Sequence, residues 1–235
     1  MLRATHLNIG IFGDSIGKGI LLRPDSNRYS TFKINLHQLI GASEHKLSIQ
    51  NYCMMGSTIS KGRSVMKRHI HELTKFQTIM LEFGGNDCDY NWNKISENPH
   101  STYDCNTPIH QFIDEYTLMI EEIREHNVQP IMLTLPPLVP ERYFNWISRN
   151  LNKENILAWL GGDINVIYRW QEMYNVQVTM LATKLKVPLI DIRSAFLMNT
   201  QYKQFICEDG IHPNEAGYKL IYKTVSEQYK QSILV

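Results

Sequence analysis

The chain has 235 residues, a formal net charge of +1, 43% hydrophobic residues and 20% charged residues. Domains usually hold about 100–200 residues, so this length favours one domain, and the ordinary composition excludes disordered, collagen-like and coiled-coil proteins. A nearly neutral chain without a basic block lacks the electrostatic pattern of a nucleic-acid-binding protein or of one held on an anionic membrane. We therefore expect a single domain over residues 1–235, with neither a nucleic-acid partner nor stable membrane association.

Cysteine spacing and the first residues indicate the compartment. The four cysteines form no C-x-x-C pair, which argues against a zinc ribbon or a thioredoxin-like motif. The N-terminal residues lack the apolar run of a secretory signal, and no stretch approaches the ~18–20 apolar residues of a membrane span. These features predict reduced thiols in a cytoplasmic protein, with no metal and no cofactor, and leave the oligomeric state open.

Short apolar, β-branched runs alternate with stripes of apolar residues at helical spacing. In chain order we expect five strands, 7–12, 47–52, 78–83, 131–135 and 187–192, and between and after them five helices. The apolar stripes of the helices span 32–40, 65–73, 112–123, 164–185 and 218–229. The second helix should follow the N-caps Ser57 and Thr58, the third should open at Thr107-Pro108, and the last should begin near Asn214. Alternation of this kind is typical of a parallel sheet with helices on both faces, so the fold class is α/β and doubly wound.

Ligands of doubly wound folds bind outside the carboxyl ends of the strands, so we expect functional residues in the loops there. Two connections, 88–106 and 137–161, are much longer than the ~4–6 residues that are usual. Segments of this length are lids, binding loops or partly helical caps. Four of their aromatic residues would form either a wall of the binding site or, the reading that we favour, a small core beneath the loops: Trp92, Tyr143, Phe144 and Trp146.

A glycine-rich segment, residues 13–19, follows the first predicted strand and has three possible interpretations: a nucleotide-binding loop, a nucleophile elbow or an exposed serine at the end of a strand. It is not a phosphate-binding loop, because the Walker pattern needs glycine where Phe12 stands and Ser or Thr where Gly19 stands. A dinucleotide fingerprint starting at Gly17 would need glycine in place of Leu22. Neither nucleotide motif is therefore present.

Residues 13–17 also match the Gly-x-Ser-x-Gly nucleophile elbow of α/β-hydrolases. Only fourteen residues precede Ser15, however, which leaves no room for the strands that come before such an elbow. The remaining reading is a serine exposed at the carboxyl end of the first strand, with partners from elsewhere in the chain.

A serine nucleophile needs a base, and the base needs a group that orients it. Asp209 and His212 lie three positions apart in the loop before the last predicted helix. In a tight turn this spacing lets the carboxylate reach the imidazole Nδ1 while Nε2 faces outward. The alternative is a surface turn whose two residues only cap the helix.

Two further motifs follow strands of the same sheet. Gly84-Gly85-Asn86-Asp87 comes after the third strand, where the side-chain NH₂ of Asn86 could donate to a developing oxyanion. Gly56 comes after the second strand, where its backbone N–H could serve the same purpose at a helix start. Each motif alone could be an ordinary turn, but the fold would bring the Ser, Gly, Asn and His motifs to one edge.

In this combination the sequence resembles the SGNH hydrolases, also called GDSL-type esterases or lipases. Their four blocks correspond to residues 13–15, Gly56, residues 84–87 and residues 209–213, which together span nearly the whole chain. The resemblance implies a flavodoxin-like three-layer α/β/α sandwich with a five-stranded parallel sheet. One departure is that Ile16 and Gly17 stand where many relatives carry a hydroxyl residue, which we expect to alter the pocket floor.

The resemblance also implies the roles of individual residues. Ser15 would be the nucleophile, His212 the general base and then acid, and Asp209 the residue that orients His212. The N–H groups of Ser15 and Gly56 would form the oxyanion hole with the Asn86 side chain. We expect hydrolysis of a small carboxylic ester, with a short acyl group such as acetyl on a carbohydrate or similar alcohol. The alternatives are a lysophospholipase or thioesterase, and a catalytically silent ligand-binding module.

Overall fold

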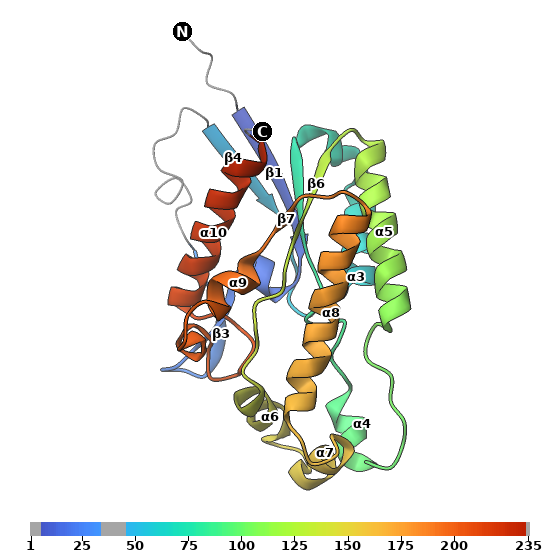
Figure 1. Ribbon diagram of the computed structural model, residues 1–235, viewed down its shortest axis with the longest axis vertical. Coiled ribbons are helices and arrows are strands. Elements are labelled where there is room, and N and C mark those ends of the chain that lie inside the picture. Colours follow the sequence, from blue (N-terminus) through green and yellow to red (C-terminus); the bar gives the residue numbers. More distant parts are fainter. Residues whose placement is uncertain (1–5, 34–45, 234–235) are drawn as a thin grey trace.

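A five-stranded, all-parallel sheet lies at the centre of the computed structural model, which describes residues 6–33 and 46–233 (Figure 1). The strands are β1 (His6–Gly13), β4 (Lys46–Asn51), β5 (Thr78–Glu82), β6 (Gln129–Leu133) and β7 (Leu189–Ile190). Their order in the sheet, β4-β1-β5-β6-β7, is the flavodoxin-like order. The predicted fold class is therefore confirmed. Most of the helix expected over residues 32–40 lies outside the described residues.

Helices cover both faces of the sheet, as the apolar strands require. In β5, Ile79 and Leu81 pack into the core of one face and Met80 into the core of the other. The first face is covered by α3 (Ile59–Arg68), α5 (Ile109–Glu125) and α8 (Asn165–Lys184), and the second by α9 (Ile192–Leu197) and α10 (Glu215–Ile233). Among the described helices, none has both the length and the hydropathy needed to cross a membrane.

Several predicted boundaries are wrong by a few residues. The strand expected over 187–192 is only Leu189–Ile190, because Asp191 caps α9 by accepting a hydrogen bond from the Ser194 N–H. The strand expected over 131–135 starts and ends two residues earlier. The helix expected over 65–73 is two elements, α3 and the 3-10 helix η1 (Ile70–Lys75), which meet at His69.

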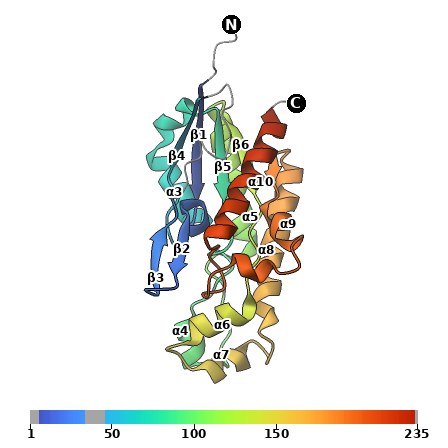
Figure 2. The same ribbon diagram turned by 90° about the vertical axis from the view of Figure 1, so that its left-hand side faces the viewer.

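The two long connections are largely helical and pack together beyond the carboxyl ends of the strands (Figure 2). They contain α4 (Trp92–Glu97), α6 (Pro140–Ser148) and α7 (Lys153–Trp159). Seven of their apolar side chains form a separate buried core together with Ile167 of α8: Trp92, Ile95, Leu138, Tyr143, Phe144, Ile156 and Leu160. A partly helical cap is thus present, and we call α4, α6 and α7 the helical cap. Of the four aromatic residues expected in its small core, Trp92, Tyr143 and Phe144 are there, but Trp146 packs against the core of the second sheet face.

A short antiparallel hairpin that the sequence analysis missed follows β1. Its strands are β2 (Ile20–Arg23) and β3 (Arg28–Thr31). The Tyr218 hydroxyl donates a 2.6 Å hydrogen bond to the Ile20 carbonyl, and an ion pair of 3.0 Å joins Arg23 to Glu215. Because α10 provides both contacts, the position of the hairpin depends on residues about 200 positions away.

Candidate active site

Ser15 opens a one-turn helix, α1 (Ser15–Lys18), directly after β1, an inner strand of the sheet. Asp14 caps this helix, because its Oδ1 accepts a hydrogen bond of 2.8 Å from the Ile16 N–H. Ser15 is 7% exposed. The chain crosses from β1 to β4 on one side and continues to β5 on the other, so Ser15 lies at the topological switch point where doubly wound folds bind ligands.

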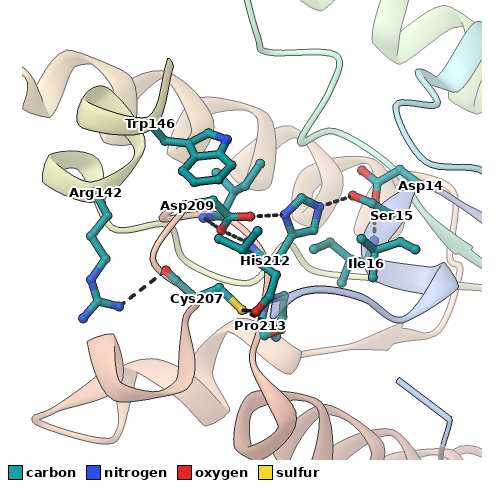
Figure 3. A network of polar contacts seen from close by, with 12 residues as sticks. Asp14, Ser15, Ile16, Arg142, Trp146, Cys207, Asp209, His212 and Pro213 are labelled. Atoms are coloured by element: carbon teal, nitrogen blue, oxygen red, sulfur yellow. Dashed lines mark hydrogen bonds and ion pairs between the residues drawn. The ribbon is translucent and has the colours of Figure 1, made fainter. Parts of the chain in front are cut away.

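A hydrogen bond connects Ser15 to His212 in the loop before α10, and a second one joins His212 to Asp209 within that loop (Figure 3). His212 Nε2 lies 2.9 Å from Ser15 Oγ, and His212 Nδ1 lies 2.6 Å from Asp209 Oδ2. The expected contact between the serine and the histidine is therefore present. Asp209 and His212 are both buried, so the surface turn that was the alternative reading is wrong.

The hydrogen-bond partners of Asp209 define the state of the imidazole. Its Oδ1 accepts from the backbone N–H groups of Ile211 and His212, each at 3.1 Å. Burial alone would raise the pKa of this carboxyl, but the side-chain hydrogen bond and charge of His212, with the backbone N–H groups, lower it below its usual range. An ionised carboxylate only accepts, so Nδ1 carries the hydrogen and Nε2 is free to accept from the Ser15 hydroxyl.

Gly210 makes the turn between Asp209 and His212 possible. Its φ of +80° lies in the left-handed region, and a Cβ there would stand 2.7 Å from the Val139 carbonyl oxygen and collide with the Tyr143 backbone. The Val139 N–H donates to the Gly210 carbonyl at 2.8 Å. The loop is thereby held against the start of the helical cap.

Asn86 lies in the loop after β5, on the other side of the switch point. Its Nδ2 donates a hydrogen bond of 2.9 Å to Asp14 Oδ2, so the residue that caps α1 also holds the amide. The next residue, Asp87, accepts from the Ile59 N–H at 2.9 Å and connects this loop to the start of α3. One amide hydrogen of Asn86 is engaged with Asp14, which leaves the other available to a ligand.

Gly56 lies in the loop between β4 and α3. Its φ is +71°, and a Cβ would meet nothing within 4 Å. The loop is connected to β1 through the Met54 N–H, which donates to the Gly13 carbonyl at 3.1 Å. In the described residues no hydrogen bond joins Gly56 to Ser15 or Asn86. The fold brings Gly56 to the same sheet edge, but of the five predicted site residues it alone makes no direct contact that would show its role.

Glu82 is a feature of the site that the sequence analysis missed. It ends β5, is 1% exposed, and its carboxyl is hydrogen bonded to that of Asp14. Burial raises the pKa of both groups. The charge and the hydrogen bond of Asp14 raise the pKa of Glu82 further, whereas the hydrogen bond with Glu82 lowers the pKa of Asp14. We infer that the pair shares a proton. The sequence contained a signal for this partner, because an acidic residue inside an apolar strand such as 78–83 is buried and needs a hydrogen-bond partner.

Two aromatic side chains lie beside the imidazole. The Tyr29 ring, from β3, packs edge-on against His212 with 5.1 Å between the ring centroids. Trp146 of α6 packs against Tyr29 at 6.2 Å, and the Arg149 guanidinium lies over the Trp146 ring at 3.8 Å. Burial, with the charge of Asp209, raises the pKa of the Tyr29 hydroxyl, so this group stays neutral. Tyr29 is 37% exposed and therefore accessible to a ligand at His212.

A cavity of about 260 Å³ opens beside Ser15 and extends under the helical cap. Asp14, Ser15 and Asn86 line one end. The other walls come from the loops after β5 and β6, from the helical cap and from the first turns of α8. The long connections thus enclose a pocket as well as a small core.

The four cysteines are all buried and free. Burial raises the pKa of the Cys53, Cys88 and Cys207 thiols. Across residues 6–33 and 46–233, no group of three or more His, Cys, Asp or Glu residues could hold a metal ion.

The sequence matches the GDSL-like lipase/acylhydrolase family over residues 9–225. A search of curated proteins found no match. The chain is similar in structure to a lipase/acylhydrolase from Enterococcus faecalis, with 19% identity, a TM-score of 0.68 and 96% of each chain covered.

Two other solved structures show the same fold at low identity. An acetylxylan esterase from Geobacillus stearothermophilus is 14% identical, with a TM-score of 0.63 over 97% of this chain and 96% of that one. A GDSL-like lipase from Parabacteroides merdae is 16% identical, with a TM-score of 0.64 over 97% of each chain. At these identities the likeness establishes the fold and leaves the substrate open.

Proposed function

The chain belongs to the GDSL-like lipase/acylhydrolase family, and from this premise we propose that it hydrolyses carboxylic esters through a covalent acyl-enzyme. Ser15 is the proposed nucleophile, His212 the general base and then acid, and Asp209 the residue that orients His212. The proposed oxyanion hole combines the N–H groups of Ser15 and Gly56 with the Asn86 side-chain amide.

In the first half of the proposed reaction, His212 Nε2 takes the proton of the Ser15 hydroxyl while Oγ attacks the ester carbonyl carbon. The carbonyl oxygen becomes an oxyanion, which accepts from the free amide hydrogen of Asn86 and the backbone donors. The carbon–oxygen bond to the alcohol then breaks. The alcohol leaves with the proton that His212 returns to it, and the acyl group remains on Ser15 Oγ.

Water completes the cycle in the second half. His212 Nε2 takes a proton from a water molecule as the water oxygen attacks the acyl carbon. The bond to Ser15 Oγ breaks, the proton passes to Oγ, and the carboxylic acid leaves. Throughout, the Asp209 carboxylate stabilises the imidazolium that forms, and its low pKa keeps it ionised at neutral pH.

The observation that carries the proposal is the unbroken line of hydrogen bonds from Asp209 through His212 to Ser15, at 2.6 and 2.9 Å. A ligand-binding module would need neither the base nor the residue that orients it. The family match also supports the proposal that the chain is a single domain. The acetylated carbohydrate, the cytoplasmic location and the lack of nucleic-acid and membrane partners stay predictions.

The test is steady-state hydrolysis of p-nitrophenyl esters by the wild type, by Ser15→Ala and by Ser26→Ala, which removes the hydroxyl of an exposed serine. We expect Ser15→Ala to lower kcat by about 10⁴-fold or more, since the nucleophile is lost. Ser26→Ala should retain the activity of the wild type. Equal activity of Ser15→Ala and the wild type would disprove the role of Ser15.

A further inference from the structure

Two different surfaces flank Ser15, an enclosed cavity and an aromatic surface. They can be assigned to the acyl and the alcohol parts of an ester. The cavity of about 260 Å³ is lined by Ser15 and Asn86 but, among the described residues, not by His212. On the other side His212 faces Tyr29 and, beyond it, Trp146. The serine oxygen therefore stands between an enclosed pocket and an aromatic surface.

The chemistry of the proposed reaction decides which half of the ester lies on which side. His212 must protonate the departing alcohol oxygen, so the alcohol lies within reach of Nε2, on the side of Tyr29. The oxyanion must lie beside Asn86. The remaining substituent of the tetrahedral carbon is the acyl chain, and it points into the cavity.

The far walls of this cavity suit an uncharged chain. They include the apolar side chains of Trp92, Leu138, Leu160, Val166 and Ile167. The half-buried Asp89 carboxyl also lines the cavity, but it already accepts a 2.8 Å hydrogen bond from Trp92 Nε1 and a second from the Tyr143 hydroxyl. Arg169 also lines the cavity but is exposed, so its charge can stay in water, and the Trp170 Nε1–H there is buried without a partner among the described residues. An apolar group entering the pocket leaves the hydrogen bonds of Asp89 intact and removes its own surface from water.

The volume is much larger than an acetyl group needs. Dry apolar cavities of about 150 Å³ already take up a six-carbon ring such as benzene, and this cavity measures about 260 Å³. We infer that the pocket under the helical cap binds the acyl chain of the substrate and selects medium-length, uncharged acyl groups of about six to eight carbons. This inference rests on the proposed ester hydrolysis, and it differs from the acetyl group expected from the sequence.

The experiment varies the acyl chain at a constant alcohol. The kcat/KM of the wild type is measured with p-nitrophenyl acetate, butyrate, hexanoate and octanoate. Each methylene buried in an apolar site strengthens binding by roughly fourfold. We expect kcat/KM for hexanoate to exceed that for acetate by at least about tenfold. A preference for acetate over hexanoate and octanoate would overturn the inference.

A pair of matched substitutions on α8 tests whether the preference for longer acyl chains comes from the cavity. Val166 lines the cavity from the first turn of α8, whereas Val176 lies on the same helix, is 43% exposed and is absent from the lining. Val166→Phe should lower kcat/KM for hexanoate and octanoate about tenfold and that for acetate less than threefold. Val176→Phe should change neither. If Val166→Phe does not fold, Val166→Leu should give the same pattern with a smaller loss.

Binding of uncharged amides separates failure of this inference from failure of the proposed function. Calorimetry with hexanamide and acetamide should give a Kd at least about tenfold lower for hexanamide, and Val166→Phe should abolish the difference. Hexanamide binding without hydrolysis of any ester would disprove the esterase and support the pocket. Ester hydrolysis without preferential hexanamide binding and without an effect of Val166→Phe would disprove the pocket and leave the esterase standing.

Discussion

The substitution Asp209→Asn should leave the shape of the site almost unchanged but shift the His212 imidazole to the tautomer that carries its hydrogen on Nε2. Asp209 Oδ1 accepts two backbone N–H groups, from Ile211 and His212, whereas Oδ2 faces His212 Nδ1. An Asn side chain keeps both backbone hydrogen bonds only if its oxygen takes the Oδ1 position. Its NH₂ group then faces Nδ1, which must accept, so the ring hydrogen moves to Nε2. Nε2 can no longer take the proton of Ser15.

The size of the loss in kcat follows from the two backbone N–H groups that hold Asp209 Oδ1. Turning the amide round would place NH₂ against both N–H groups, of which that of His212 is buried and that of Ile211 half-buried. Leaving these two donors unpaired costs roughly 2–6 kcal/mol. At 1.4 kcal/mol per factor of ten, the productive orientation is populated at about 4% or less. In serine hydrolases of the Ser-His-Asp type this substitution lowers kcat about 10⁴-fold, and we expect a loss of this order here.

The assay is kcat with a p-nitrophenyl ester, together with the thermal midpoint of unfolding. Glu208→Gln is the matched control, because Glu208 is the neighbouring acid, its side chain is 76% exposed and its ion pair with Arg142 is long, at 3.9 Å. Asp209→Asn should lose activity while its midpoint stays within a few degrees of the wild type, and Glu208→Gln should keep both. An Asp209→Asn variant with more than a tenth of the activity of the wild type would refute the tautomer argument.

Two further predictions concern the loop after β5. Asn86→Ala should lower kcat by about 10²–10³-fold, because one oxyanion donor is lost, and it should therefore impair hydrolysis less than Ser15→Ala. A kcat within threefold of the wild type would exclude Asn86 from the oxyanion hole. Burial raises the pKa of Asp87 to about 7, whereas the unfolded chain titrates near its ordinary value of 3.8. The protonated carboxyl thus stabilises the fold fully below about pH 4, and this contribution is lost as the pH rises towards 7, with an upper limit of about 4 kcal/mol. Asp87→Asn keeps an acceptor for the Ile59 N–H and removes the titration, so its melting temperature should fall less than that of the wild type between pH 5 and pH 8. Equal falls in the two proteins would contradict the raised pKa.

Local patterns were enough to predict the sheet and the meeting of Ser15 with His212. Each strand is a short apolar run whose character does not depend on its neighbours, and a parallel sheet puts the carboxyl ends of all strands at one edge. The spacing of Asp209 and His212 is likewise local, because a turn of four residues brings the carboxylate to Nδ1. Boundary errors such as the strand over 187–192 arose where a cap, here Asp191, ends an otherwise continuous apolar run.

Contacts between segments far apart in the sequence decided which other residues surround the proposed triad. Tyr29 reaches His212 only because α10 holds the hairpin through Tyr218 and Glu215, and no residue near Tyr29 signals that contact. Glu82 meets Asp14 because β5 pairs with β1 in a particular register, with Gly13 opposite Glu82.

The sequence by itself therefore determined the order of the strands along the chain and the α/β class, since both depend on short-range periodicity. Its motifs also indicated the proposed triad, whose residue roles came from the family resemblance. Only the tertiary structure decided the size of the pocket and what surrounds the proposed nucleophile. The volume beside Ser15 is what remains after α4, α6, α7 and α8 have packed against one another. A volume left between packed helices is a property of their joint arrangement, and no single segment of sequence encodes it.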